Sequence, residues 1–243
     1  MEKSIFEIIE NKKIAKDIYF CTLHGDTSHI TAPGQFINIA LDGKYLRRPL
    51  SVCDYDDKSV TVIYKIVGGG TEQMSKMKSG ETLDVLTGLG NGFDVSMCGK
   101  SPLLIGGGVG IPPMYRLAKD IIRTGVIPAV VLGFNTAGDA FYIDEFKKLG
   151  AYVHVATVDG SIGTKGFVTD IVKNLEYTYF YTCGPLPMLK AVYNTTCTSG
   201  QLSFEERMGC GFGACMGCSC KTKYGNKRIC KDGPVLQKEE IIW

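Results

Sequence analysis

The C-terminal segment of this 243-residue chain carries the feature that most constrains its fold, a run of closely spaced cysteines. The run CGFGACMGCSCKTKYGNKRIC contains Cys210, Cys215, Cys218 and Cys230. A C-x4-C-x2-C spacing followed by a more distant cysteine is the plant-type pattern for ligating a [2Fe-2S] cluster. The interleaved glycines let the backbone curl closely around a metal centre and turn its amides toward the sulfurs. The run therefore predicts a small cluster-binding module that moves electrons.

Two other interpretations of these cysteines stay open at this point. A structural zinc site typically uses two C-x2-C pairs, whereas here the first pair is spaced by four residues and the last cysteine stands alone. A disulfide framework needs an oxidising compartment, and the chain opens MEKSIFEIIENKK, without the pattern of a secretory signal. We therefore expect reduced thiols and a cytoplasmic protein. Cys220 neighbours the third ligand position, but the plant-type spacing selects Cys218.

Composition excludes some classes of partner. The formal net charge is only +2, and basic residues alternate with acidic ones, so there is no electrostatic footprint for nucleic acid. No apolar stretch approaches the roughly 20 residues that a membrane-spanning helix needs. We expect neither a nucleic-acid partner nor a membrane partner.

The pattern of apolar residues changes twice along the chain. Up to residue 97 it forms short alternating runs such as GQFINIAL and SVTVIYKIV, which predict an antiparallel β-barrel. From residue 98 to 202, strands such as LLIGGG and PAVVLGF alternate with helices expected at 113–123, 143–149 and 167–175, which predicts a doubly wound parallel α/β domain. Over residues 203–243 the apolar residues show no regular periodicity. We predict a multidomain β plus α/β protein with domains 1–97, 98–202 and 203–243.

A glycine-rich loop in the second region carries a nucleotide signal. The segment LLIGGGVGIPPM places Gly106, Gly107, Gly108 and Gly110 between an apolar strand and a helix. Backbone at such a turn can approach a pyrophosphate at the helix N-terminus. The G-x-G-x-x-G form is not matched cleanly, and a tight strand-to-helix connection is the alternative interpretation.

A second loop of the same region follows the strand YTYFYT. Cys183, Gly184 and Pro185 come directly after it and precede another helix. The carboxyl ends of strands in an open parallel sheet form the ligand crevice, so Cys183 is expected at its edge, unless it is a buried small residue. Near Asn135, no Arg or Lys is available to clasp a 2'-phosphate, which favours NAD over NADP.

The first region contains two matching segments. RRPLS offers a cationic fork for a phosphate, a stiff proline and the hydroxyl of Ser51. YKIVGGGT provides Lys65 on a strand, then a glycine turn and Thr71 at the start of a short helix, which is a plausible second phosphate cradle. A solvated strand end and a flexible hairpin loop are the alternatives.

The order of these motifs resembles the ferredoxin-NADP reductase superfamily over nearly the whole chain. The segment ERMGCGFGACMGCSCKT, with KDGP after the last cysteine, is similar to the electron-transfer subunits of class 1B, NAD-dependent dihydroorotate dehydrogenases. The resemblance implies FAD in the barrel, NAD in the α/β domain and a [2Fe-2S] cluster in the C-terminal module. The implied FAD contacts are Arg48, Pro49, Leu50, Ser51, Ile63, Tyr64, Lys65, Gly70 and Thr71, and the implied NAD contacts are Gly106, Gly107, Gly108, Gly110, Cys183, Gly184 and Pro185. Cys183 is further implied to border the path of hydride transfer.

The resemblance also implies a partner. This would be an FMN-containing catalytic subunit that oxidises dihydroorotate in pyrimidine biosynthesis, within a heterotetramer of two copies of each chain. Electrons would pass through the cluster to FAD and leave as hydride to NAD+. The same architecture serves subunits of NADH-dependent ferredoxin:NADP oxidoreductases, sulfhydrogenases and sulfite reductases. A zinc-stabilised interaction module is the non-enzyme alternative.

Overall fold

A computed structural model describes residues 1–243 and contains a closed N-terminal β-barrel. Its strands are antiparallel and lie in the order β1-β2-β5-β4-β3-β6. Their bounds are β1 (Glu2–Ala15), β2 (Ile18–His24), β3 (Phe36–Ile39), β4 (Arg48–Tyr55), β5 (Ser59–Lys65) and β6 (Thr82–Leu89), with helix α1 (Gly69–Ser75) between β5 and β6. Alternate apolar side chains of these strands, among them Ile37 and Val62, fill the interior. The predicted barrel is confirmed.

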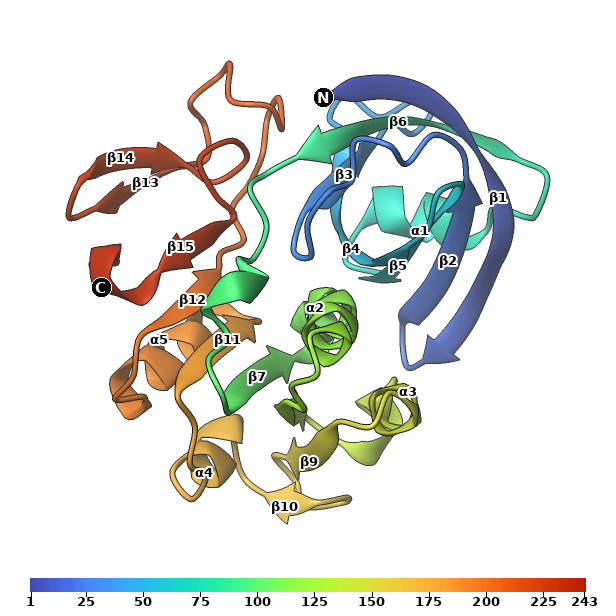
Figure 1. Cartoon of the computed structure of the whole chain (residues 1–243). Helices are drawn as coiled ribbons and strands as arrows, with labels where there is room; N and C mark the ends of the chain where they lie inside the picture. Colours follow the sequence, from blue (N-terminus) through green and yellow to red (C-terminus); the bar gives the residue numbers. More distant parts are fainter.

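A second sheet of seven strands has the order β10-β9-β8-β7-β11-β12-β15. Its parallel strands are β7 (Pro102–Gly107), β8 (Ala129–Phe134), β9 (Tyr152–Thr157), β10 (Thr164–Lys165), β11 (Tyr179–Cys183) and β12 (Gly200–Ser203). The helices are α2 (Ile111–Arg123), α3 (Ile143–Lys148), α4 (Val168–Val172) and α5 (Leu186–Thr195). Helices α2 and α3 share one apolar core with the sheet, and α4 and α5 share the other, which confirms the doubly wound fold (Figure 1).

The helix ends follow local chemistry. Helix α2 begins at Ile111, two residues before the predicted start, because Pro112 and Pro113 fit the first turn, where their missing N–H groups have no intrahelical partner. Helix α4 is shorter than predicted. Beyond Val172 the chain closes in tighter turns, in which the amides of Asn174 and Leu175 bond three residues back.

The C-terminal segment is woven into the sheet rather than appended to it. Strands β13 (Ser219–Thr222) and β14 (Gly225–Arg228) form a separate hairpin, but β15 (Val235–Gln237) pairs antiparallel with β12. In Figure 1 this segment, in red, and the barrel, in blue, both lie above the parallel sheet. The segment between β12 and β15 is thereby held close to the barrel.

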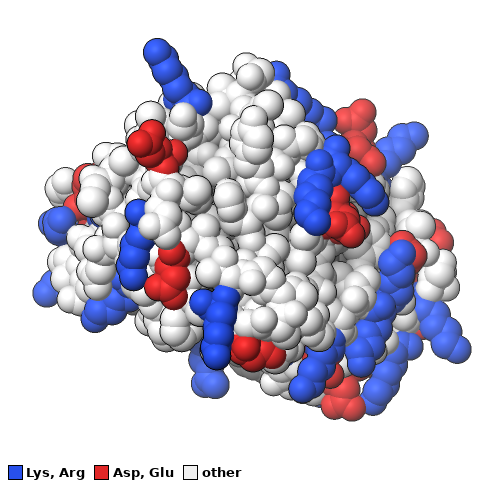
Figure 2. Space-filling model, turned by 90° about the horizontal axis from the view of Figure 1, so that it is seen from below, with Lys and Arg blue, Asp and Glu red and all other residues white.

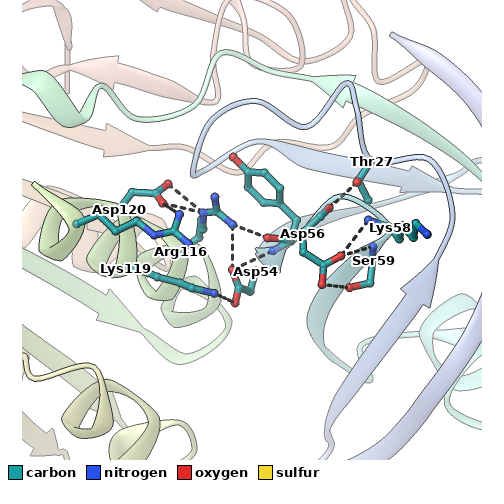
Figure 3. A network of polar contacts seen from close by, with 10 residues as sticks. Thr27, Asp54, Asp56, Lys58, Ser59, Arg116, Lys119 and Asp120 are labelled. Atoms are coloured by element: carbon teal, nitrogen blue, oxygen red, sulfur yellow. Dashed lines mark hydrogen bonds and ion pairs between the residues drawn. The ribbon is translucent and has the colours of Figure 1, made fainter.

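Helix α2 joins the barrel to the sheet through an ion-pair network, shown in Figure 3. The guanidinium of Arg116 donates to Asp54 of β4 at 3.2 Å and to both carboxylate oxygens of Asp120, and it stacks on the ring of Tyr55 at 3.7 Å. Lys119 donates to the same Asp54 at 2.6 Å. We call this group of five residues the α2–β4 clamp. It fixes the barrel against the sheet above a shared apolar core.

The surface carries both signs of charge. On the face in Figure 2, Lys and Arg side chains are interspersed with Asp and Glu around a broad area without charged residues. None of the helices is both long enough and apolar enough to span a bilayer.

Candidate electron-transfer and cofactor sites

The four predicted ligand cysteines lie as two neighbouring pairs. In the first pair, the amide of Cys215 donates to the sulfur of Cys210 at 3.4 Å, and the Cys210 amide donates to the Cys215 sulfur at 3.5 Å. In the second, the amide of Cys230 donates to the sulfur of Cys218 at 3.4 Å. All four thiols are free, and no group of three or more His, Cys, Asp and Glu side chains is placed to hold a single metal ion. Two thiol pairs suit a [2Fe-2S] cluster, in which each iron takes two protein ligands.

The backbone of this loop favours thiolate at its exposed end. Burial alone would raise the pKa of Cys210, but the amides of Cys215, Phe212 and Ala214 donate to its sulfur and lower the pKa overall. Burial raises the pKa of Cys230, and the neighbouring Cys218 and Cys210 raise it further. The loop thus supplies amide donors to the sulfurs, a feature that stabilises an electron-accepting cluster.

Cys220 occupies a different environment from Cys218. Its main chain pairs with Lys227 in the β13–β14 hairpin, and its side chain is half-buried against the apolar core. Burial and the charge of Glu206 raise its pKa. The structure brings Cys218, not Cys220, into contact with Cys230, in line with the plant-type spacing.

An ion pair beneath the cluster loop holds its shape. Arg228 donates through its amide and its Nε to Asp232, at 2.9 Å each, and through Nη1 to the carbonyl of Gly213 at 2.9 Å. Gly213 has a φ of +93°, and an ideal Cβ there would lie 2.6 Å from the side chain of Lys231. The loop turn at this position therefore requires glycine.

The predicted flavin phosphate site is a close approach between two segments of the barrel. The guanidinium of Arg48 lies against Gly70, where an ideal Cβ would sit 2.2 Å from Nε. The hydroxyl of Thr71 accepts from the amide of Val67 at 3.0 Å and donates to the carbonyl of Gly68 at 3.1 Å, so it closes the glycine turn. A phosphate fits this cradle because it combines a guanidinium with the amides at the start of α1.

The two predicted flavin strands separate at this site. Strands β4 and β5 pair with each other from Val52 to the end of β4 and from the start of β5 to Val62. The part of β4 before Val52 pairs only with β3, and the part of β5 after Val62 pairs only with β2. Their facing edges are therefore free to bond a flat ligand between them. This opening is flanked by predicted contacts from both strands, namely Pro49, Leu50, Ser51, Ile63, Tyr64 and Lys65.

The side chains of β5 limit how it could bind a flavin. Tyr64 points into the barrel, where its hydroxyl donates to Asn11 at 3.0 Å, and Ile63 is buried against the core shared with α2. Only Lys65 is exposed. Ile63 and Tyr64 are thus available to a ligand through the main chain.

The predicted nucleotide loop packs tightly against the end of β11. An ideal Cβ at Gly110 would lie 2.3 Å from the carbonyl oxygen of Cys183, and one at Gly107 would lie 2.4 Å from the sulfur of Met188. Gly106 is likewise pressed against Ile111. Only Gly108, with a φ of +51°, faces open space. Three of the four glycines are therefore required for loop packing, and a Cβ would find open space only at Gly108.

Cys183 lies at the C-terminal end of β11, beside Gly106 at the end of β7. Burial raises the pKa of its thiol to about 12, and a hydrogen bond with Ser203 opposes this only in part. The half-buried environment of Cys183 thus favours the protonated thiol over the thiolate. Gly184 and Pro185 continue the same close contact with the nucleotide loop.

Sequence reasoning missed two residues that join these sites. The side chain of Asn91, within the motif GLGNGF, bonds both main-chain groups of Val235, at 2.8 and 3.1 Å, and its amide donates to Gly233. Asn38 of β3 reaches the carbonyl of Cys210. The glycines beside Asn91 are a sequence signal for this contact between segments, because glycine is found where two backbones approach closely, and Gly90 is pressed against Pro234. No local pattern marks Asn38.

Comparison with known proteins places this arrangement in a family. The model for the iron-sulfur cluster binding domain of dihydroorotate dehydrogenase B matches residues 205–242, and that for the oxidoreductase NAD-binding domain matches residues 104–194. A dihydroorotate dehydrogenase B (NAD+) electron transfer subunit from Fusobacterium nucleatum is 46% identical, over 96% of this chain and 95% of that protein. One from Geobacillus sp. is 43% identical, over 100% and 99%.

The chain belongs to the family of dihydroorotate dehydrogenase B electron transfer subunits. The resemblance and the NAD-linked oxidoreductase class predicted for it are confirmed. The matched domains and the fold bear out the predicted cofactor set of FAD, [2Fe-2S] and NAD, and the iron-sulfur match favours a cluster over zinc.

Solved structures agree with this family fold. An NADH-dependent reduced ferredoxin-NADP oxidoreductase, described in a study of flavin-based electron bifurcation, superposes with a TM-score of 0.91 at 32% identity, covering 99% of this chain and 90% of that one. A ferredoxin NADP+ reductase from Neisseria gonorrhoeae with bound FAD and NADP has a TM-score of 0.69 at 18% identity, covering 80% and 90%. The second likeness concerns the fold alone.

Proposed function

We propose that this chain accepts electrons at the cluster loop from an FMN-containing catalytic subunit that oxidises dihydroorotate to orotate, and delivers them as hydride to NAD+. The overall reaction would convert dihydroorotate and NAD+ to orotate, NADH and a proton. When bound, the flavin supplies the exchange between one-electron and two-electron transfer that links a cluster to a nicotinamide. The residues of this chain would hold the cluster, the flavin and the nicotinamide one after another along the electron path.

A continuous series of contacts from the cluster loop to the nucleotide loop carries this proposal. The carbonyl of Cys210 meets Asn38 of β3, and β3 pairs with the β4 segment that contains Arg48 and Ser51. Across the opening, β5 lies beside the 3-10 turn η2 (Gly108–Gly110). Gly110 then packs on Cys183. This order of contacts supports an electron path from the cluster through the barrel to the nicotinamide.

The roles of individual residues belong to the same proposal. Cys210, Cys215, Cys218 and Cys230 hold the cluster, Arg48 with the Gly70 turn holds the FAD pyrophosphate, and Gly108 meets the NAD pyrophosphate. Cys183 would border the nicotinamide as a protonated, half-buried thiol. Residues 1–97, 98–202 and 203–243 would then bind FAD, NAD and the cluster.

Exposed apolar side chains on the cluster loop support a protein partner at this end. Phe212 is 41% exposed and Met216 is 54% exposed, and both lie within the cysteine run. Exposed apolar groups beside a redox centre suit a protein interface. We propose that the catalytic subunit covers this loop in a heterotetramer of two copies of each chain.

The test is co-expression with an FMN-containing catalytic subunit, followed by measurement of NAD+ reduction that depends on dihydroorotate. Cys230→Ser is the informative variant, because it should abolish this reaction and leave NADH-dependent dye reduction through the flavin intact. Dye reduction by the wild-type complex without any dihydroorotate-dependent NAD+ reduction would contradict the proposal.

The full-length likeness to an NADH-dependent reduced ferredoxin-NADP oxidoreductase supports a second candidate. In that case reduced ferredoxin, rather than an orotate-forming subunit, would exchange electrons with this chain. Reduction of NAD+ by photoreduced ferredoxin in place of dihydroorotate would favour this candidate.

A further inference from the structure

Asn38 is a polar residue buried beneath the cluster loop, on the outer face of the barrel. In β3, Ile37 and Ile39 point into the barrel core, whereas Phe36 packs in the apolar core that contains Cys218 and Cys230. The two-residue alternation of a strand puts Asn38 on the same face as Phe36. The residue is only 1% exposed although its side chain lies outside the barrel.

The amide of Asn38 is in contact with the first predicted ligand segment. Its Nδ2 lies 3.5 Å from the carbonyl oxygen of Cys210. The next residue, Gly211, has a φ of +80°, and an ideal Cβ there would lie 2.2 Å from the same Nδ2. The loop can rest on this amide only because residue 211 is glycine, and the amide presents its donor end to the loop.

On its other side, Asn38 lies beside the predicted flavin site. Its main chain is paired with Pro49, between Arg48 and Ser51, and Arg47 donates to its carbonyl at 3.2 Å. The Oδ1 of Asn38 is buried and has no hydrogen-bond partner within the protein. An unpaired buried amide oxygen costs stability, so this site calls for an explanation beyond packing.

We propose that Asn38 is a positioning residue that holds the Cys210 segment against the flavin strand and raises the reduction potential of the cluster. This inference rests on the proposed function. Hydrogen-bond donors to the sulfurs set the potentials of such clusters, because they stabilise the added electron, and the donors to the Cys210 sulfur are the main-chain amides of Ala214 and Cys215. The Nδ2 of Asn38 donates to the carbonyl of Cys210, so Asn38 acts by holding the loop in the position from which those amides reach the sulfur.

The test is an EPR-monitored redox titration of the cluster in the complex purified without oxygen, with flavin and cluster loaded. Asn38→Leu removes the donor, and Asn38→Asp keeps the shape while placing a carboxylate at the loop. We expect the equilibrium between oxidised and reduced cluster to shift toward the oxidised form by about tenfold in Asn38→Leu, a fall of about 59 mV for one electron, and by more in Asn38→Asp.

Asn11→Leu is the matched control. Asn11 is also an amide of the barrel, but it bonds Met74, Met77 and Tyr64, away from the cluster. The Asn11→Leu variant should lower the melting temperature without changing the reduction potential of the cluster. It therefore separates a general loss of stability from a specific effect on that potential.

Cluster potentials unchanged in both Asn38 variants, with the iron content intact, would overturn the inference. If Asn38→Leu fails to fold, the nearly isosteric Asn38→Asp alone decides. Dihydroorotate-dependent NAD+ reduction by the wild-type complex is measured separately, so that failure of the proposed function is distinguished from failure of this inference.

Discussion

Replacing Arg116 with Met should uncouple the barrel from the nucleotide-binding sheet. The Arg116 side chain is only 11% exposed and bonds carboxylates on both sides of the interface, Asp54 of β4 and Asp120 of α2. Methionine keeps the apolar stem and removes the charge, so the change isolates the polar part of the α2–β4 clamp.

The expected cost follows from what remains after the substitution. Removing one partner of a buried pair costs about 3–5 kcal/mol. Asp54 and Asp120 keep some exposure, 23% and 18%, and Lys119 still pairs with Asp54 at 2.6 Å. We therefore expect the free energy of unfolding to fall by about 2–3 kcal/mol, of which about 1 kcal/mol is the lost stacking on Tyr55.

The functional effect should be selective for one step. Hydride transfer requires the nicotinamide and the flavin in a tightly defined geometry, and a displacement of about 1 Å can cost about 100-fold in rate. Stopped-flow reduction of the flavin by NADH should therefore slow by about 10- to 100-fold in Arg116→Met. Electron exchange between cluster and flavin should be affected less, because the cluster segment keeps contacts of its own with this side of the interface, through Asn38 and Asn91.

Arg123→Met is the matched control on the same helix. Arg123 is 60% exposed and pairs only with Asp120, so its loss should cost about 0–1 kcal/mol and leave hydride transfer unchanged. A rate in Arg116→Met within about twofold of the wild type, despite measured destabilisation, would refute the coupling between this clamp and the geometry of hydride transfer.

Three further predictions concern the cysteines and the nucleotide loop. Cys218→Ser should bleach the visible absorbance of the cluster and Cys220→Ser should not; the reverse result would show that the third ligand is misassigned. Gly110→Ala places a Cβ 2.3 Å from a main-chain oxygen, so it should lower the free energy of unfolding by about 1–3 kcal/mol and weaken NADH binding by at least about tenfold in calorimetric titration. Gly138→Ala is the control, because its Cβ would meet only one atom, at 3.6 Å, and it should leave NADH binding unchanged. Burial raises the pKa of Cys21 to about 12, from about 8.5 when unfolded. The folded state then holds a proton that the unfolded state releases, so this contribution to stability is complete below about pH 8.5 and declines by about 1.4 kcal/mol per pH unit above it. Denaturant titrations should show a shallower alkaline loss in Cys21→Ala; an identical slope would contradict this assignment.

The fold was largely predictable because its signals are local. Two-residue alternation marks the barrel strands, and strands alternating with helices mark the parallel sheet. The spacing of the cysteines predicts the cluster module, and the match to the iron-sulfur cluster binding domain bears this out. The end of helix α4 was less predictable, because tertiary packing and tight turns decide where a short helix stops.

The site was less predictable where function depends on contacts between distant segments. The sequence predicts that glycine at positions 106, 107 and 110 gives a pyrophosphate room to approach, and the structure adds that an ideal Cβ at each would collide with protein atoms. Sequence cannot separate these two uses of glycine, since both require the absence of a side chain.

The amino-acid sequence alone determined the kinds of site this chain carries, since motif spacing and periodicity act over a few residues. Only the tertiary structure decided how those sites are connected. Asn38 and Cys210 are 172 residues apart, and Arg116 and Asp54 are 62 apart, yet each pair is in contact. Such contacts depend on how strands close into a barrel and how a helix packs across it, and no local pattern encodes that geometry.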